Sequence, residues 1–129
     1  MDSNIPKGKS LLYIEDDLVV LTAYRDRLQA AGFQVECSVD GLEAMHVLAM
    51  RVFDLIILDL MLPRFSGAEI LKAVRDNPRL KSIPVVIFCT NLDVAPPDVL
   101  RLADKLLLKG ECTIQNLLQT IQGLLAPQG

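Results

Sequence analysis

Short runs of apolar residues alternate along this sequence with longer segments in which apolar residues recur at every third or fourth position. A short apolar run is typical of a buried strand, and the longer periodicity is typical of a helix with one buried face. The pattern predicts strands at residues 11–14, 33–37, 54–59, 85–89 and 106–108. It predicts helices at residues 18–31, after Asp40, and at 68–76, 99–104 and 113–125. A strand followed by a helix, repeated along the whole chain, builds a parallel sheet with helices on both faces.

The residues at the start of the second and fourth predicted helices indicate where these helices begin. Asp40 is a good N-cap residue for the second helix, whose Leu42, Met45 and Leu48 are expected to face the core. The fourth helix follows Pro96-Pro97. A helix cannot run through this pair of prolines, although it can begin there. We therefore expect the fourth helix to be short or irregular.

The length of 129 residues corresponds to about one domain. We expect that domain to cover residues 10–125, with a flexible N-terminal tail at 1–9 and a C-terminal tail or linker stub at 126–129. Hydrophobic residues make up 51% of the chain and charged residues 22%, which is typical of a folded globular protein and excludes wholesale disorder.

Charge and hydropathy exclude several functions. The formal net charge is −3 without a strong basic cluster, so we expect no nucleic acid to be bound by this chain. Charged residues interrupt every apolar run before it could span a bilayer, so we expect no membrane partner. The first nine residues lack the apolar core of a secretory signal. Cys37, Cys89 and Cys112 have no metal-ligand or redox spacing, which favours reduced thiols in a cytoplasmic protein.

Polar residues that can carry chemistry follow the predicted strands. Glu15-Asp16-Asp17 ends the first strand, Asp59 the third, Thr90 the fourth and Lys109 the fifth. In open α/β sheets, ligands bind at the carboxyl ends of the strands. A cluster of carboxylates at that edge needs a neutralising cation, and oxygen ligands with room for water favour Mg²⁺. Such a site, with Lys109 and Thr90 opposite, is expected to receive a phosphoryl group, with Asp59 as the nucleophile.

The sequence resembles the receiver domains of two-component response regulators over nearly its whole length. The matching segments are LLYIEDD, DLIILDLMLPRFSG, IPVVIFCT and LLLKG, and the second is the most specific, with a proline four residues and a glycine eight residues after Asp59. The resemblance implies a flavodoxin-like (βα)5 three-layer sandwich with a parallel five-stranded sheet in the order 2-1-3-4-5. It also implies a signalling domain rather than a turnover enzyme.

The resemblance assigns a role to each site residue. It implies that Asp59 is the phosphoacceptor and that Mg²⁺ is held by Glu15, Asp16, Asp59 and the backbone carbonyl of Met61. It further implies that a sensor histidine kinase or phosphotransfer protein donates the phosphoryl group. A downstream protein target or effector domain then reads the change, usually on the surface formed by the fourth helix, the fifth strand and the fifth helix.

The resemblance also implies that Lys109 pairs with the phosphoryl oxygens and that Thr90 donates a hydroxyl hydrogen bond to them. The segment from Pro84 to Thr90 is one residue longer than is usual in the family, so Cys89 is a second candidate for the hydroxyl position. We favour Thr90.

This sequence departs from the family in the region that transmits the signal. Leu106 stands where an aromatic residue is usual, Gly110 replaces a common proline, and the interval from Thr90 to Lys109 is short. These departures leave open a pseudo-receiver that acts as a phosphorylation-independent scaffold. A phosphatase and a flavin-binding domain are less favoured. An aspartyl-phosphate phosphatase needs a second Asp where Met61 stands, and the acids after the first strand would repel the phosphate of a flavin.

Overall fold

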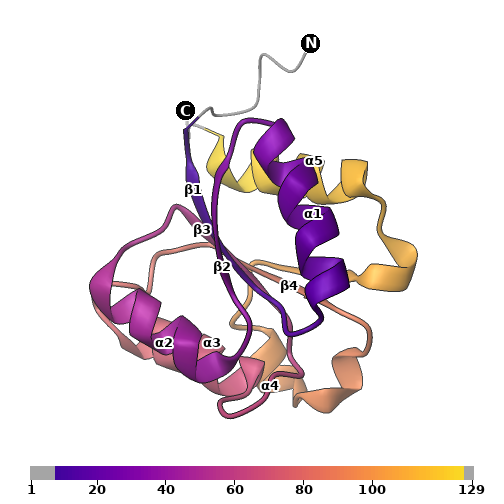
Figure 1. Cartoon of the computed structure of the whole chain (residues 1–129). Coiled ribbons are helices and arrows are strands. Elements are labelled where there is room, and N and C mark those ends of the chain that lie inside the picture. Colours follow the sequence, from indigo (N-terminus) through magenta and orange to yellow (C-terminus); the bar gives the residue numbers. More distant parts are fainter. Residues whose placement is uncertain (1–7, 127–129) are drawn as a thin grey trace.

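A five-stranded parallel sheet with helices on both faces forms the centre of the computed structural model, which describes residues 8–126 (Figure 1). The strands lie in the order β2-β1-β3-β4-β5. Their bounds are β1 Ser10–Ile14, β2 Gln34–Ser38, β3 Leu55–Leu58, β4 Val85–Cys89 and β5 Lys105–Leu108. The predicted flavodoxin-like arrangement, including its strand order, is confirmed.

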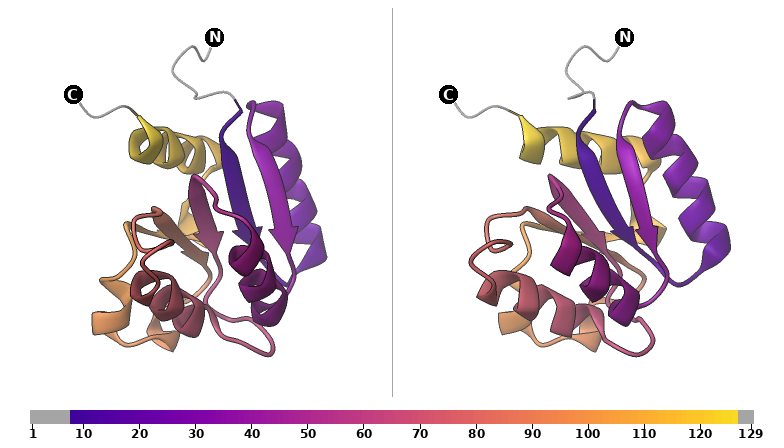
Figure 2. Two further views of the ribbon diagram at one scale, coloured as in Figure 1. Left: turned by 90° about the vertical axis from the view of Figure 1, so that its left-hand side faces the viewer. Right: turned by 60° about the vertical axis from the view of Figure 1, so that its left-hand side comes forward.

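The helices divide between the two faces of the sheet, as the two views in Figure 2 show. One face is covered by α1 (Leu18–Ala30) and α5 (Ile114–Leu125), and the other by α2 (Gly41–Met50), α3 (Gly67–Asp76) and the short α4 (Pro97–Leu100). Two 3-10 turns, η1 (Leu92–Val94) and η2 (Lys109–Glu111), follow β4 and β5. The molecule is therefore a three-layer sandwich.

Alternation along the strands supplies a separate core to each face. Ile56 and Ile87 pack with α2, α3 and α4, whereas Ile57 and Phe88 pack with α1 and α5. Successive side chains of a strand point to opposite faces, so a strand covered on both sides must be apolar throughout. This is why the central strands read as continuous apolar runs rather than as alternating ones.

The ladder between the central strands brings the acidic residues together. β1 pairs with β3 in parallel, and the pairing continues past β3 because the Asp59 N–H donates to the Ile14 carbonyl at 3.1 Å. On the other side, the Glu15 N–H donates to the Ser38 carbonyl at 3.0 Å. Glu15 and Asp59 therefore leave the sheet at its carboxyl edge, on adjacent strands.

One predicted core residue of α2 is exposed. The buried residues of this helix are Gly41, Ala44 and Leu48, and Leu42 is 39% exposed. The expectation that Leu42 faces the core is wrong. α2 is apolar around much of its circumference, and its buried face includes Gly41, where a Cβ atom would lie 1.7 Å from the Phe65 carbonyl oxygen of the loop after β3.

The fourth helix differs from the predicted range of 99–104. α4 begins at Pro97 and ends at Leu100, so the pair of prolines starts the helix instead of preceding it. The residues that follow are held by Arg75 of α3, whose guanidinium donates to the Leu102 carbonyl at 2.7 Å and to Asp104 Oδ1 at 2.8 Å. The Arg75 side chain thus provides a hydrogen-bond donor to a backbone carbonyl that is not paired within a longer α4.

The predicted tails lie mostly outside the described residues, which leave out 1–7 and 127–129. Of the expected tail at 1–9, the Gly8 N–H donates to the Gly32 carbonyl at 3.1 Å, and the Lys9 carbonyl accepts from the Gln34 N–H at 2.9 Å. Between residues 8 and 126, none of the helices has both the length and the apolar character needed to cross a membrane.

Candidate phosphoacceptor site

Three carboxylates meet at the carboxyl edge of the sheet. Oxygens of Glu15, Asp16 and Asp59 lie within 4.8 Å of one another. Glu15 is 1% exposed and Asp59 is 7% exposed, whereas Asp16 lies at the surface. The site thus has two buried acids and one that faces the solvent.

Lys109 supplies the positive charge of the cluster. Its ammonium group lies at the carboxyl end of β5, where it donates to Glu15 Oε1 and, at 3.1 Å, to Asp59 Oδ2. The same nitrogen lies 5.8 Å from the centre of the Phe88 ring, an apolar neighbour that limits its access to water. The predicted convergence of Lys109 with the acidic residues is present in the structure.

The charges of the cluster do not balance, and the pKa values reflect this. Burial raises the pKa of Glu15 above its ordinary value, although Lys109 and the Asp17 N–H oppose the change. Burial by itself would lower the pKa of Lys109, but its contacts with Glu15 and Asp59 outweigh this and raise it. Both shifts mean that the site retains protons firmly, as expected where negative charge exceeds positive charge.

Local backbone groups orient the two buried acids. The Met61 N–H donates to Asp59 Oδ1 at 3.2 Å, and the Asp17 N–H donates to Glu15 Oε2 at 3.1 Å. Asp17 itself caps α1, with Oδ1 accepting from the Val19 N–H at 3.0 Å. The third acid of the Glu15-Asp16-Asp17 run is therefore used by the helix, which leaves the first two for the site.

Gly67 allows the loop after β3 to close against the site. A Cβ atom at this position would lie 2.2 Å from the Asp59 carbonyl oxygen, which is far inside contact distance. Gly67 is also the first residue of α3, whose N-cap is Ser66. The glycine eight residues after Asp59 is therefore required because backbone packs directly on backbone at this point.

The structure places Thr90 and Cys89 differently. Cys89 ends β4 and is buried, and burial raises the pKa of its thiol above the ordinary value. Its thiol donates to the Asn91 carbonyl at 3.5 Å. Thr90 follows the strand with an exposed side chain, and within residues 8–126 this side chain makes no hydrogen bond. The structure thus brings Glu15, Asp16, Asp59 and Lys109 together, whereas the Thr90 side chain is exposed after the end of β4.

The donor set fits a hard divalent cation. Glu15, Asp16 and Asp59 offer carboxylate oxygens at mutual distances that one ion can bridge, and excess negative charge favours its binding. Asp16 is exposed, which leaves room for the water molecules that Mg²⁺ retains. Met61, the predicted carbonyl ligand, lies in the loop two residues after Asp59, and it is 59% exposed.

Comparison with known proteins identifies the class to which this fold and this acidic edge belong. The family "Response regulator receiver domain" matches residues 11–122. The chain belongs to this family, which is a family of signalling domains of two-component systems, as the resemblance in the sequence implied.

The chain is similar to individual curated response regulators. The polar-differentiation response regulators DivK of Brucella anthropi and Brucella ovis are each 35% identical over 78 residues. That match covers 60% of this chain and 63% of each relative, so the chain spans less than two thirds of their length.

Solved structures agree with this assignment. The chemotaxis response regulator CheY4 of Vibrio cholerae is 28% identical with a TM-score of 0.79 and covers 92% of this chain and 99% of its own. A response regulator of Chloroflexus aurantiacus is 26% identical with a TM-score of 0.83, over 92% and 98% of the two chains.

Proposed function

We propose that this receiver domain takes a phosphoryl group onto Asp59 in a Mg²⁺-dependent reaction and thereby switches a protein-interaction surface. The observation that carries the proposal is the position of Asp59, which is 7% exposed and contacts Lys109 at 3.1 Å within a cluster of three carboxylates. The donor would be a phosphohistidine of a sensor histidine kinase or phosphotransfer protein in the cytoplasm.

The transfer forms one bond and breaks another. A carboxylate oxygen of Asp59 attacks phosphorus as the phosphorus–nitrogen bond of the phosphohistidine breaks. The ring leaves as neutral imidazole, because its other nitrogen already carries a proton in the donor. The product is an acyl phosphate on Asp59. The Met61 N–H on Oδ1 holds the carboxylate in one orientation, so that its attack along the line of the leaving group needs little rearrangement.

Lys109 and the residues that would hold Mg²⁺ allow the site to accept the negative charge of the phosphoryl group. The Lys109 ammonium donates to Glu15 and lies next to Asp59 Oδ2. From this position it can pair with a phosphoryl oxygen once Asp59 is phosphorylated. Glu15, Asp16, Asp59 and the Met61 carbonyl would hold Mg²⁺, which when bound offsets the negative charge that develops on the phosphoryl oxygens.

The test uses acetyl phosphate as the phosphoryl donor. We expect the intact mass of the protein to increase by one phosphoryl group when Mg²⁺ is present, and to stay unchanged when EDTA removes divalent cations. Mg²⁺ alone should also raise the melting temperature, since it binds the folded site and not the unfolded chain. A protein that neither gains mass nor responds to Mg²⁺ would instead be a scaffold that binds partners without phosphorylation.

The hydroxyl donor is tested by a pair of substitutions. We expect Thr90→Ala to slow phosphorylation by acetyl phosphate about tenfold, the effect of losing one hydrogen bond worth about 1.4 kcal/mol. Cys89→Ala should have little effect, because a thiol is a weak donor and this one is already directed to the Asn91 carbonyl. Initial rates from intact-mass time courses compare the two variants. A large loss in Cys89→Ala alone would transfer the role to Cys89.

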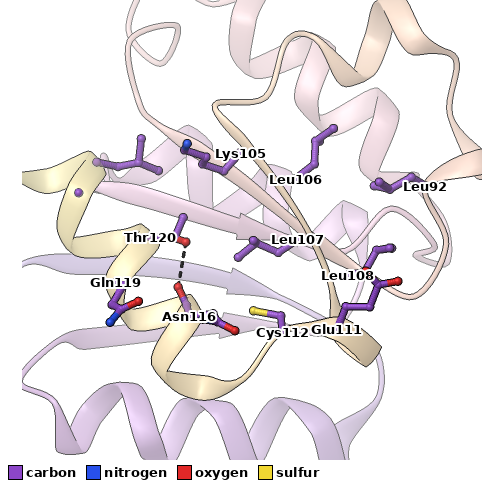
Figure 3. A pocket seen from close by; sticks show the side chains of 12 residues that line it. Leu92, Lys105, Leu106, Leu107, Leu108, Glu111, Cys112, Asn116, Gln119 and Thr120 are labelled. Carbon is purple, nitrogen blue, oxygen red and sulfur yellow. Dashed lines mark hydrogen bonds between the residues drawn. The ribbon is translucent and has the colours of Figure 1, made fainter.

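We also propose the output surface. A groove of about 720 Å³ is lined by residues of β5 and α5. Figure 3 shows the Leu107 side chain directed toward Asn116 and Thr120 of the helix, whereas Leu106 points away from the helix. β5 is an edge strand of the sheet, and Leu106 is 41% exposed where the family usually has an aromatic residue. A downstream protein target would bind across this apolar strand and the polar face of α5.

A further inference from the structure

The loop after Asp59 contains a strained turn. Arg64 has a φ of +69°, a left-handed conformation that residues with a side chain rarely adopt. The Phe65 N–H donates to the Pro63 carbonyl at 2.8 Å, which closes a three-residue turn around Arg64. A strained backbone persists only where the surrounding contacts enforce it, so the contacts of this turn indicate what it is built to hold.

Those contacts attach the turn to the N-terminus of α2. Arg64 Nη2 donates to Asp40 Oδ2 at 2.7 Å, and the Gly41 N–H donates to the Pro63 carbonyl at 3.2 Å. A Cβ atom on Gly41 would lie 1.7 Å from the Phe65 carbonyl oxygen, so the loop backbone rests directly on the helix. Asp40 also caps α2, since its Oδ1 accepts from the Glu43 N–H.

The other end of the same loop orients the reacting group. The Met61 N–H donates to Asp59 Oδ1 at 3.2 Å, and the Gly67 N–H donates to the Leu60 carbonyl at 3.0 Å. Arg64 lies between these two hydrogen bonds in the sequence. Movement of the turn away from α2 would therefore reach Asp59 and Met61 through a short stretch of backbone.

We propose that Arg64 is a positioning residue for phosphorylation: its ion pair with Asp40 anchors the loop of residues 60–66 to α2 and so holds Asp59 and the Met61 carbonyl in place for Mg²⁺ and the phosphoryl group. This role rests on the proposed function. The Arg64 side chain is 60% exposed and does not reach the acidic cluster in this structure; it acts through Asp40 and the backbone.

The chain offers variants that isolate the ion pair. Arg64→Ala removes the cation, and Arg64→Lys keeps a charge at the same position. Asp40→Asn removes the anion but retains the helix cap, because asparagine is as good an N-cap as aspartate. Arg51→Ala is the control, since Arg51 is about as exposed as Arg64 and its ion pair with Glu36 involves no residue of the loop.

The first measurement needs no phosphorylation. In metal-free protein, we expect the Met61 and Gly67 amides to exchange hydrogen about threefold faster in Arg64→Ala and Asp40→Asn than in the wild type, a change within the range that an exposed ion pair produces. Calorimetric titration with Mg²⁺ alone should show a similar loss of affinity. Arg64→Lys should recover most of both effects, and Arg51→Ala should show neither.

Wild-type exchange rates and wild-type Mg²⁺ affinity in both Arg64→Ala and Asp40→Asn would overturn the role of Arg64. A failure of the proposed function gives a different pattern, because the wild-type protein itself would then not be phosphorylated while the exchange rates still report on the loop. High salt provides a further check: it should bring the wild type toward Arg64→Ala, since it screens an exposed pair.

Discussion

Asp59→Asn should abolish phosphorylation by acetyl phosphate and Mg²⁺ while the domain stays folded. Asparagine has the shape of aspartate, and its side-chain oxygen can still accept a hydrogen bond from the Met61 N–H or from Lys109, both of which donate to the Asp59 carboxylate. What the variant lacks is an anionic oxygen that can attack phosphorus. Intact-mass spectrometry should therefore show the added phosphoryl group in the wild type and not in Asp59→Asn.

The matched control for this experiment is Asp98→Asn, an identical change at an exposed position of α4. It should be phosphorylated at the wild-type rate. An added phosphoryl group that persists in Asp59→Asn would show that a different residue accepts it, and the assignment of the site would have to be withdrawn.

Lys109→Met should cause a large loss of stability. Glu15 and Asp59 are buried, and Lys109 contacts both of them. Removing the cation leaves two buried carboxylates without their partner, which costs about 3 kcal/mol in a metal-free buffer near neutral pH. Denaturant unfolding measures this loss. Phosphorylation should also slow by about 100-fold, since a charged group that stabilises the transition state is missing.

The pH dependence of Lys109→Met follows from Glu15. Burial already raises the pKa of Glu15, and loss of the ammonium removes a group that lowers it. A carboxyl group with a raised folded-state pKa destabilises the folded state as the pH rises through that value, and the penalty disappears on acidification. The difference in unfolding free energy between the wild type and Lys109→Met should therefore shrink as the pH falls, and added Mg²⁺ should also reduce it.

Lys105→Met serves as the control, because Lys105 lies on the same strand with an exposed side chain. It should change stability by a few tenths of a kcal/mol at most. If Lys109→Met were as stable as Lys105→Met in metal-free buffer at neutral pH, the buried ion pairs at the carboxyl edge would not form in solution.

Most of the site residues could be predicted from the polar residues that follow the apolar strands. The strands are apolar runs that end abruptly in Glu15, Asp59 and Lys109, and a parallel sheet brings those ends to one edge. Neither periodicity nor spacing could show that Lys109 contacts Glu15 as well as Asp59. That contact depends on how far the lysine side chain reaches across the neighbouring strands, which is a property of the tertiary structure.

The features that the sequence did not predict depend on close packing between elements. Gly41 of α2 is buried directly against the backbone of the loop after β3, and the neighbouring Leu42 is left exposed. Likewise, the pairing of Arg64 with Asp40 joins residues that are 24 positions apart, and no local pattern signals it. The early end of α4 depends on Arg75, which holds the residues after the helix from a different element.

The most direct test is a crystal structure of the protein with Mg²⁺ and beryllium fluoride, which imitates the phosphoryl group. We expect beryllium fluoride on the Asp59 carboxylate, the Lys109 ammonium in contact with a fluorine atom, and Mg²⁺ held by Glu15, Asp16, Asp59 and the Met61 carbonyl. An unmodified Asp59 at saturating Mg²⁺ and beryllium fluoride, or an adduct on another residue, would contradict the claim that this acidic edge accepts phosphorus.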